Sequence, residues 1–370
     1  MNGLLPAPKS DFIGLKDKVH LATGGEPPLL VRHRDAFENF AADKARGMDG
    51  YAQHWTVVDQ VRALLAPHFA LAADEIALIG NASEGIVKAL SSIDWTEGDN
   101  AVVCELDYAS GRYAFAGLAR YGVGIRLIPG NGWRVETSDL LAACDERTRA
   151  VYVSQVNAMT GQLVDIALLS KALAGTPTIL ILDASHALGV VPVRANLADF
   201  TVSSCYKFAL GIHEGVFAWN RKRRPNFVPF GVGWAAANPT DSNSGFQWKP
   251  DARRVEFGNA GHLGAYLLRD SLHYLNTFGI EAIQGHAQAM VRHLITSMAA
   301  RGCDVMTPNG PDEQAGNAAF VHTDTQSFVK KAAADGIFVW GDNNRIRASA
   351  HLFTTEADVD YFLERLPGYL

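Results

Sequence analysis

The sequence predicts an α/β protein, in which helices cover a mainly parallel seven-stranded sheet and a smaller α+β domain follows toward the C-terminus. The first observation is a series of short apolar segments, rich in β-branched residues, that do not alternate with polar residues. Such strands are typical of a parallel sheet buried on both faces. The second observation is that helical patterns lie between these segments, which favours a helix-covered sheet. The predicted strands span residues 76–79, 101–104, 125–128, 150–153, 178–182, 200–203 and 216–219.

Helices are predicted between these strands and again in the last third of the chain. The helical patterns between the strands span residues 83–90, 140–143 and 166–174. After Gly261 the pattern changes to two long amphipathic segments, 263–278 and 280–300, which end near Gly279 and Gly302. Glycine is common just past the end of a helix. A strand, a helix, a strand and a helix then follow at 318–321, 325–335, 337–340 and 356–366.

These patterns divide the chain into three expected parts. An N-terminal segment covers residues 1–20, a large α/β domain covers 21–255, and a small α+β domain covers 256–370. No flexible linker separates them, and the glycines and prolines within 229–239 predict a large loop.

The composition fits a folded protein that does not bind nucleic acid. The chain has 370 residues, of which 48% are hydrophobic and 19% are charged, as in ordinary globular proteins. Lys and Arg together number 33 and Asp and Glu number 39, so the net charge is -6. A polyanion needs a clustered positive surface. The only dense basic run, residues 221–224, is interpreted as a solvated turn.

The N-terminus and the cysteines favour a cytoplasmic protein with no membrane partner. Residues 1–15 lack a charged region followed by a long apolar run, and no apolar stretch reaches the length of a membrane span. None of the four cysteines has CxxC spacing, which excludes zinc ribbons and thioredoxin-type motifs. The absence of a disulfide framework favours a reducing compartment.

Two charged residues follow neighbouring predicted strands. Asp183 ends one strand, and Lys207 lies shortly after the next. Because the carboxyl ends of parallel strands converge on one crevice, both side chains are expected there. They are interpreted either as an ion pair or as the partners of pyridoxal phosphate (PLP), with the lysine joined to the aldehyde and the aspartate beside the pyridine nitrogen. The two residues alone leave both interpretations open.

The segment 80–85 closes one strand and opens a helix. The first turn of a helix presents free amides and the positive end of its dipole, which suits a phosphate, and Ser83 offers a hydroxyl. The alternative is an ordinary helix cap made by Asn81 or Ser83.

Several segments together resemble one enzyme family. The stretch that begins Asp183-Ala-Ser-His186, followed by Ser204-Cys-Tyr-Lys207, resembles the PLP motif of class V aminotransferases, which are enzymes of fold type I. That group includes cysteine desulfurases, kynureninases and isopenicillin N epimerase-like enzymes. Further blocks resemble the family in the same order, at residues 81–84, 155–161, 250–259 and 345–355. The resemblance covers most of the chain from about residue 21 to 366 and implies PLP as the cofactor of the large domain.

The resemblance also implies roles for individual residues. Lys207 would bind the PLP aldehyde and carry the proton of the substrate's alpha carbon, and Asp183 would pair with the pyridine nitrogen. His186 would lie near the ring's phenolic oxygen, Tyr108 would stack on the ring, and Asn157 would approach the ring oxygen. The phosphate would be held by Ala82, Ser83, Ser204 and Tyr206.

Three more positions concern the substrate and a second subunit. Arg347 would bind the substrate carboxylate, for which a guanidinium fork is well shaped, and Arg345 is the nearby competitor. Gly24 belongs to a loop that would line the substrate entrance. Asn259 falls where the family reaches the phosphate of a neighbouring subunit, and the resemblance implies a homodimer with active sites at the subunit boundary.

The expected activity is PLP-dependent turnover of an amino acid, with transamination placed first. Epimerisation, or a β-elimination lyase similar to kynureninase or selenocysteine lyase, is the alternative. A desulfurase-type persulfide is not expected, because no cysteine follows Cys303. A nucleotide-binding oxidoreductase is disfavoured because residues 80–85 do not supply its glycine-rich fingerprint. The presence of Asp183 and Lys207 disfavours a non-catalytic relative.

Overall fold

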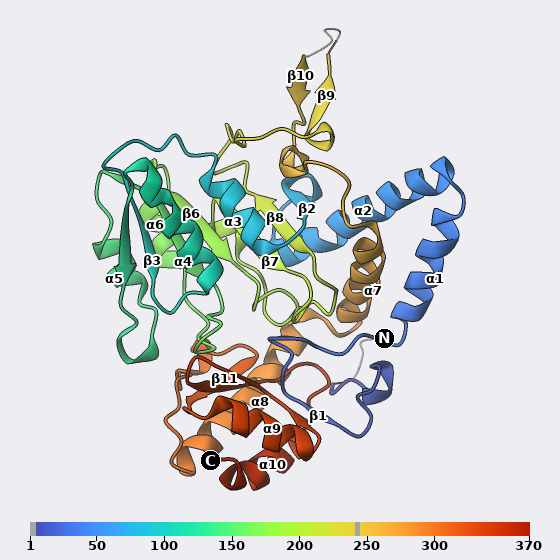
Figure 1. Ribbon diagram of the computed structural model, residues 1–370, viewed down its shortest axis with the longest axis vertical. Coiled ribbons are helices and arrows are strands. Elements are labelled where there is room, and N and C mark those ends of the chain that lie inside the picture. Colours follow the sequence, from blue (N-terminus) through green and yellow to red (C-terminus); the bar gives the residue numbers. More distant parts are fainter. Residues whose placement is uncertain (1–4, 241–244) are drawn as a thin grey trace.

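A mixed seven-stranded sheet forms the centre of the larger part of the molecule (Figure 1). The computed structural model describes residues 5–240 and 245–370. The strand order is β2-β8-β7-β6-β5-β3-β4, and only β8 within this sheet runs antiparallel to its neighbours. The mainly parallel seven-stranded sheet predicted from the sequence is therefore confirmed. The strands are β2 (Ile76–Ile79), β3 (Asn100–Cys104), β4 (Gly124–Ile128), β5 (Thr148–Ser154), β6 (Ile179–Asp183), β7 (Phe200–Ser204) and β8 (Gly215–Trp219).

Helices bury both faces of this sheet, which explains why its strands lack polar alternation. One face packs against α3 (Ala82–Leu90) and α4 (Ala109–Ala116). The opposite face is covered in two places. Near β2 and β8 it packs against α2 (Met48–Phe69) and α7 (His262–Phe278), and near β3 to β6 against α5 (Thr137–Ala142) and α6 (Ala167–Leu173).

A smaller α+β part lies below the sheet in Figure 1. Its antiparallel sheet has the order β11-β14-β13, with β11 (Asn317–Val321), β13 (Trp340–Asp342) and β14 (Arg345–Ser349). Its helices are α8 (Ile280–Ala300), α9 (Thr325–Ala334) and α10 (Glu356–Arg365). Gly279, between α7 and α8, has a φ of 84°, a conformation that glycine adopts without strain.

The N-terminal segment joins this smaller part through backbone pairing. Strand β1 (Val19–His20) runs parallel to β12 (Ile337–Phe338), and Val19 lies in the same apolar core as the helices α8 and α10. The single strand expected at 337–340 is divided into β12 and β13. The domain limits at residues 20 and 255 stay a prediction.

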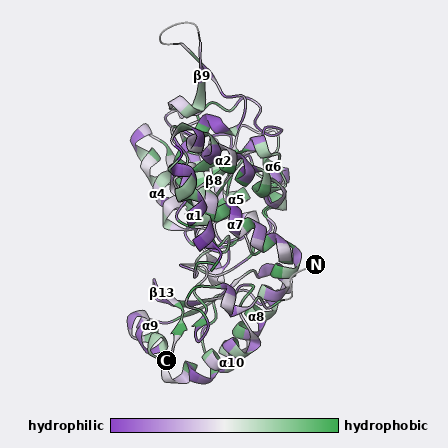
Figure 2. Cartoon of the chain, turned by 90° about the vertical axis from the view of Figure 1, so that its right-hand side faces the viewer, coloured by the Kyte–Doolittle hydropathy of each residue, from purple (hydrophilic) through white to green (hydrophobic). Residues whose placement is uncertain are grey.

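The helices α1 (His33–Lys44), α2 and α4, the strands β1 and β14, and one hairpin have no counterpart among the predicted elements. Helix α1 buries only His33 and Ala36, so its pattern carried almost no apolar signal. Helix α2 contains Pro67 in its last turns. Where a loop was predicted, β9 (Ala237–Pro239) pairs with β10 (Phe246–Trp248), and Figure 2 shows this hairpin projecting from the larger part. Among the described residues no helix is long and apolar enough to cross a membrane, and the cytoplasmic location stays a prediction.

A buried ion pair fixes the strand that leads into the first turn of α3. Arg62 of α2 donates from Nη2 to both carboxylate oxygens of Glu256, at 2.7 Å each, and one of these oxygens accepts the amide of Leu78 in β2 at 2.9 Å. Burial raises the pKa of Glu256, against the lowering effect of the Arg62 charge. The carboxylate thus depends on Arg62 for its charged form.

We expect Arg62→Met to lower the free energy of unfolding by about 3 to 5 kcal/mol, because it leaves Glu256 buried without its cation. Urea unfolding followed by circular dichroism measures the change. The control is Arg32→Met, which removes the more exposed Arg32–Asp270 pair (2.7 Å) and should cost less than about 1 kcal/mol. Equal losses in the two variants would contradict the importance of the buried pair.

Candidate active site

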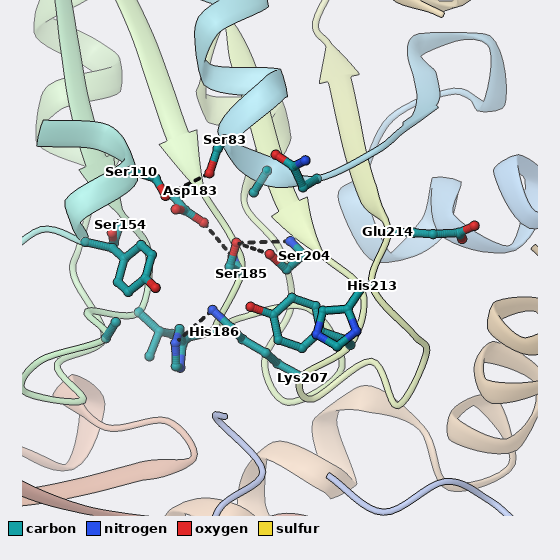
Figure 3. A pocket seen from close by; sticks show the side chains of 16 residues that line it. Ser83, Ser110, Ser154, Asp183, Ser185, His186, Ser204, Lys207, His213 and Glu214 are labelled. Carbon is teal, nitrogen blue, oxygen red and sulfur yellow. Dashed lines mark hydrogen bonds between the residues drawn. The ribbon is translucent and has the colours of Figure 1, made fainter. Parts of the chain in front are cut away.

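A cavity of about 210 Å³ lies where β6 and β7 end and α3 begins (Figure 3). Its position follows from the sheet, because the carboxyl ends of neighbouring parallel strands share one edge. The cavity brings together most of the residues singled out in the sequence. These are Ala82, Ser83, Tyr108, Asp183, His186, Ser204, Tyr206 and Lys207.

Asp183, the last residue of β6, is held by two hydrogen bonds. Its Oδ1 accepts the amide of Ser185 at 2.8 Å, and its Oδ2 accepts the hydroxyl of Tyr152 at 2.7 Å. Burial and the negative charge of Asp183 raise the pKa of Tyr152 well above its usual value, so the phenol remains a donor. Both bonds stabilise the ionised form of Asp183, which is the form that keeps a pyridine nitrogen protonated.

Lys207 lies beyond β7 and is almost fully buried. Burial lowers the pKa of its amine to about 8; the charge of Asp183 opposes this effect and that of Arg347 adds to it. Its Nζ is 3.2 Å from His186 Nε2 and 5.5 Å from the ring centres of both Tyr108 and Tyr206. The amine therefore becomes a nucleophile at a lower pH than an exposed lysine does.

His186 stays uncharged in this environment. Burial lowers the pKa of its imidazole well below the usual value, and the positive charges of Lys207, Arg347 and Arg345 lower it further. Its second ring nitrogen, Nδ1, lies 3.1 Å from the side-chain amide of Asn317 in β11. Residues from both sheets thus meet at this ring.

The opposite wall of the cavity offers groups that suit a phosphate. Asn81 caps α3 by accepting the amide of Glu84 at 2.9 Å, which leaves the first-turn amides of Ala82 and Ser83 without partners in the helix. The cap predicted for Asn81 and the phosphate site are therefore compatible. Ser83 donates to the hydroxyl of Ser110 at 2.8 Å, and Ser204 lies on the same side in Figure 3.

A glycine allows β8 to approach this turn. A Cβ at Gly215 would lie 2.6 Å from the carbonyl carbon of Asn81, so any side chain there would push β8 away from the start of α3.

Two tyrosines flank the lysine. Tyr108 caps the start of α4 and is half exposed, which leaves one face of its ring free for a stacked partner. Tyr206 stacks on His213, with ring centres 4.3 Å apart and an angle of 23°. Both stacked residues line the cavity together with Lys207.

Arg347 and Arg345 lie on the same face of β14, since they are two residues apart in a strand. Both are 3% exposed, and both donate to the carbonyl of Ala158, which lines the cavity. Arg345 also pairs with Asp342 at 2.8 Å. Within the described residues, neither Nε atom has a hydrogen-bond acceptor, and Arg347 has no carboxylate partner.

This difference separates the two arginines. Burial and, to a smaller extent, the charge of Arg345 lower the pKa of Arg347 to about 9. An anionic ligand would stabilise the Arg347 guanidinium, whereas Arg345 already has Asp342. Arg347 is therefore the better candidate for binding a carboxylate.

Four predicted site residues lie outside the cavity lining: Arg347, which reaches it only through Ala158, and the three that follow. Asn157 is fully buried, and its side chain donates to Leu106 O at 3.0 Å and accepts the amide of Met159 at 2.9 Å, so its amide group supports a turn. Asn259 is exposed and accepts the hydroxyl of Tyr51 at 2.8 Å. Gly24 packs against His186, where a Cβ would lie 3.1 Å from the imidazole. Their roles toward cofactor and substrate stay predictions.

The sequence analysis missed two buried acids and Tyr152. Asp107, next to Tyr108, is completely buried; burial raises its pKa to about 7, and the charge of Asp183 adds to this. Glu214 lines the cavity, and burial raises its pKa to about 8. Its carboxyl fills the space beside Gly264, where a Cβ would lie 2.0 Å away. Only the nearness of Asp107 to Tyr108 in sequence offered a signal.

Comparison with known proteins gives a family match over most of the chain. The family model for aminotransferase class-V matches residues 22–362. The chain belongs to this family. A probable cysteine desulfurase of Methanothermobacter thermautotrophicus is 25% identical over 295 residues, which covers 77% of this chain and 74% of the relative. A kynureninase of Burkholderia mallei is 23% identical over 308 residues, covering 78% and 72%.

Solved structures share the fold of this class V chain. The cystine C-S lyase C-DES, in complex with its reaction product cysteine persulfide, matches with a TM-score of 0.88 at 20% identity and covers 96% of this chain and 98% of its own. The apo cysteine desulfurase of Thermococcus onnurineus NA1 also has a TM-score of 0.88, at 18% identity, covering 100% and 99%. Fold type I is thereby confirmed.

PLP is the cofactor of class V enzymes, and the cavity of this chain fits it. Lys207, Asp183 and the first turn of α3 provide an amine, a carboxylate and a phosphate-binding wall around one space. The buried guanidinium of Arg347 donates to Ala158, a residue of the cavity wall, and has no carboxylate partner among the described residues. When bound, PLP supplies an aldehyde that takes up amino groups and a ring that accepts electrons from the alpha carbon.

The buried charges make the reactivity of Lys207 testable. In cofactor-free protein, amine-directed labelling of Lys207, followed by mass spectrometry across pH, should have its midpoint near the Lys207 pKa of about 8. Arg347→Leu should raise the midpoint because it removes a cation, and Asp183→Asn should lower it because it removes an anion. The exposed Arg301→Leu should leave it unchanged. Shifts in the opposite directions would contradict the assigned electrostatics.

Proposed function

We propose that this protein is a PLP-dependent lyase that acts on an amino acid and expels a substituent from its β carbon. The observation that carries the proposal is that a lysine with a lowered pKa and a hydrogen-bonded aspartate line one cavity, while a buried arginine without a described carboxylate partner contacts the cavity wall through Ala158. Asp183 would hold the pyridine proton, Arg347 would bind the substrate carboxylate, and Lys207 would move the proton of the alpha carbon.

Elimination is favoured by the proton donors around the cavity. A leaving group must be protonated as it departs, and Tyr108, Tyr206, His186 and His213 all line the space in which it would sit. Relatives named cysteine desulfurase and a fold neighbour named cystine C-S lyase support chemistry at a carbon–sulfur bond. The substrate class proposed is therefore an amino acid with a sulfur substituent on its β carbon.

The cysteines argue against a persulfide carried by the protein. All four lie in the described part of the chain, and none lines the cavity. Burial raises the pKa of the Cys205 thiol well above its usual value and that of Cys104 to about 12, which suppresses the thiolate needed for attack. The sulfur would then leave on the product side rather than on an enzyme thiol.

Transamination, placed first on the sequence alone, is the second candidate. Its support is Lys207, which can return a proton to the cofactor instead of allowing a substituent to depart. Epimerisation would require a proton to return on the opposite face of the alpha carbon. The three reactions give different products from one substrate.

We also infer that the protein works as a homodimer. Large apolar side chains stand exposed around a groove between α3 and α4, among them Val87, Tyr113, Tyr121 and Phe230. Exposed apolar patches of this kind are typical of protein interfaces. Asn259 is exposed and thus free to reach a second subunit.

Incubation with L-cysteine, L-cystine and a panel of sulfur-free amino acids separates the reactions. We expect pyruvate and a sulfur product, detected by lactate dehydrogenase coupling and a thiol assay, and Lys207→Ala should abolish them. Keto acids that retain the side chain would instead support transamination, and an inverted enantiomer would support epimerisation. Protein that takes up no PLP would overturn the proposal.

The carboxylate role of Arg347 has its own test. We expect Arg347→Leu to raise the KM of the amino acid by about 100-fold, since a charge-assisted pair contributes about 2 to 3 kcal/mol. Arg345→Leu, which removes the guanidinium already paired with Asp342, is the matched comparison and should raise KM less. Steady-state kinetics measures both, and the reverse order would assign the carboxylate to Arg345.

A further inference from the structure

A chain of hydrogen bonds joins the smaller sheet to Lys207. Ser349 Oγ donates to Asn317 Oδ1 at 2.8 Å, and Asn317 Nδ2 lies 3.1 Å from His186 Nδ1. His186 Nε2 is then 3.2 Å from Lys207 Nζ. Asn317 in β11 and Ser349 in β14 are direct partners across the antiparallel pair. The pairing of the two strands therefore places the side chains that make the first of these hydrogen bonds.

The donor and acceptor roles follow from the chemistry of each group. An amide oxygen only accepts and an amide nitrogen only donates, so with Oδ1 taken by Ser349, Asn317 donates to His186 Nδ1. A neutral imidazole carries one proton, which must then be on Nε2. That N–H points to Lys207 Nζ, which can accept it only as an uncharged amine.

The charges around His186 favour the same arrangement. Arg345 and Arg347 from β14 and Lys207 from the loop after β7 are the cationic groups that act on the imidazole. Turning the amide of Asn317 around would put the His186 proton on Nδ1 and leave Nε2 to accept from a charged ammonium. That alternative places a third cation in a buried cluster that holds two guanidinium groups already.

The Ser349–Asn317 end of this series of hydrogen bonds is completely buried. Gly24 of the N-terminal loop covers both residues. A Cβ at Gly24 would lie 2.8 Å from Asn317 Oδ1 and 2.9 Å from Ser349 Oγ. The hydrogen-bond roles of Ser349 and Asn317 are therefore set by these side chains alone.

We propose that Asn317 is a positioning residue for Lys207: held by Ser349, it keeps the His186 proton on Nε2, so that His186 donates to Nζ and favours the uncharged amine. This inference rests on the proposed function only in assigning the chemistry to Lys207. It names a residue of the smaller sheet that is not itself part of the cavity lining and that acts through His186, which is.

The first test reads the tautomer in the unaltered protein. In full-length protein labelled with ¹⁵N-histidine, the protonated and unprotonated ring nitrogens resonate far apart, and His186→Gln identifies the signals of His186. At pH 9, above the Lys207 pKa of about 8, we expect the proton on Nε2. A proton on Nδ1 would overturn the proposal, whatever the variants show.

The second test reverses the hydrogen bond. Asn317→Asp replaces the donor by an acceptor, so the His186 proton should move to Nδ1, and labelling of Lys207 at pH 7 should slow by about tenfold, the effect of one buried hydrogen bond. The absorbance of the PLP-loaded enzyme should titrate at a shifted pH as well. Ser349→Ala, which only frees the amide, should produce a smaller shift in the same direction.

Two controls separate positioning from damage to the fold. In a His186→Gln background, Asn317→Asp should change the labelling rate less than twofold, because the effect passes through the imidazole. Asn220→Asp places a carboxylate at another buried amide, which donates to Asn196 O and Ala198 O, and should leave the His186 tautomer unchanged. Equal effects of Asn317→Asp with and without His186 would refute the proposal. Unaltered protein that takes up no PLP would instead refute the proposed function.

Discussion

The burial of Asp183 and Lys207 at the ends of two neighbouring strands is the constraint on which the rest of the site depends. Burying either charge alone is costly. Asp183 keeps its charge because Tyr152 and the amide of Ser185 donate to it, while Lys207 responds by giving up its proton more readily. Arg347 adds a positive charge with no described carboxylate to pair with. The site is therefore short of negative charge, which phosphate and carboxylate groups of ligands would supply.

Both sheets contribute residues to this site. The central sheet places Asp183, Lys207 and the first turn of α3 at one edge, and apolar cores on both of its faces hold that edge in place. The smaller sheet contributes Arg347 from the face of β14 and reaches His186 through Asn317. Neither sheet alone surrounds the amine.

The sequence predicted those features whose signal is local. Buried strands are uninterrupted apolar segments, so all seven were located, and the residues that follow β6 and β7 were expected at one edge because parallel strands share it. The partners of those residues were not predicted, since Tyr152 and Asn317 meet the site only through sheet register and packing. Asn157 was expected at the cofactor from its place in a recognisable motif, which stays a prediction; its side chain donates to Leu106 O and accepts the amide of Met159, contacts that the motif did not indicate. Helix α1 was missed because it buries so little.

The pairing of β1 with β12 has a consequence for how the molecule is made. The contact joins Val19 to Ile337, and residues near both ends of the chain contribute to the same apolar core. During synthesis, β1 stays unpaired until β12, more than 300 residues later in the sequence, has emerged from the ribosome. Contacts between such distant positions close late and slow the search for the native state. The loop that covers Asn317 follows this strand directly, so the active site is completed only at the last stage of folding.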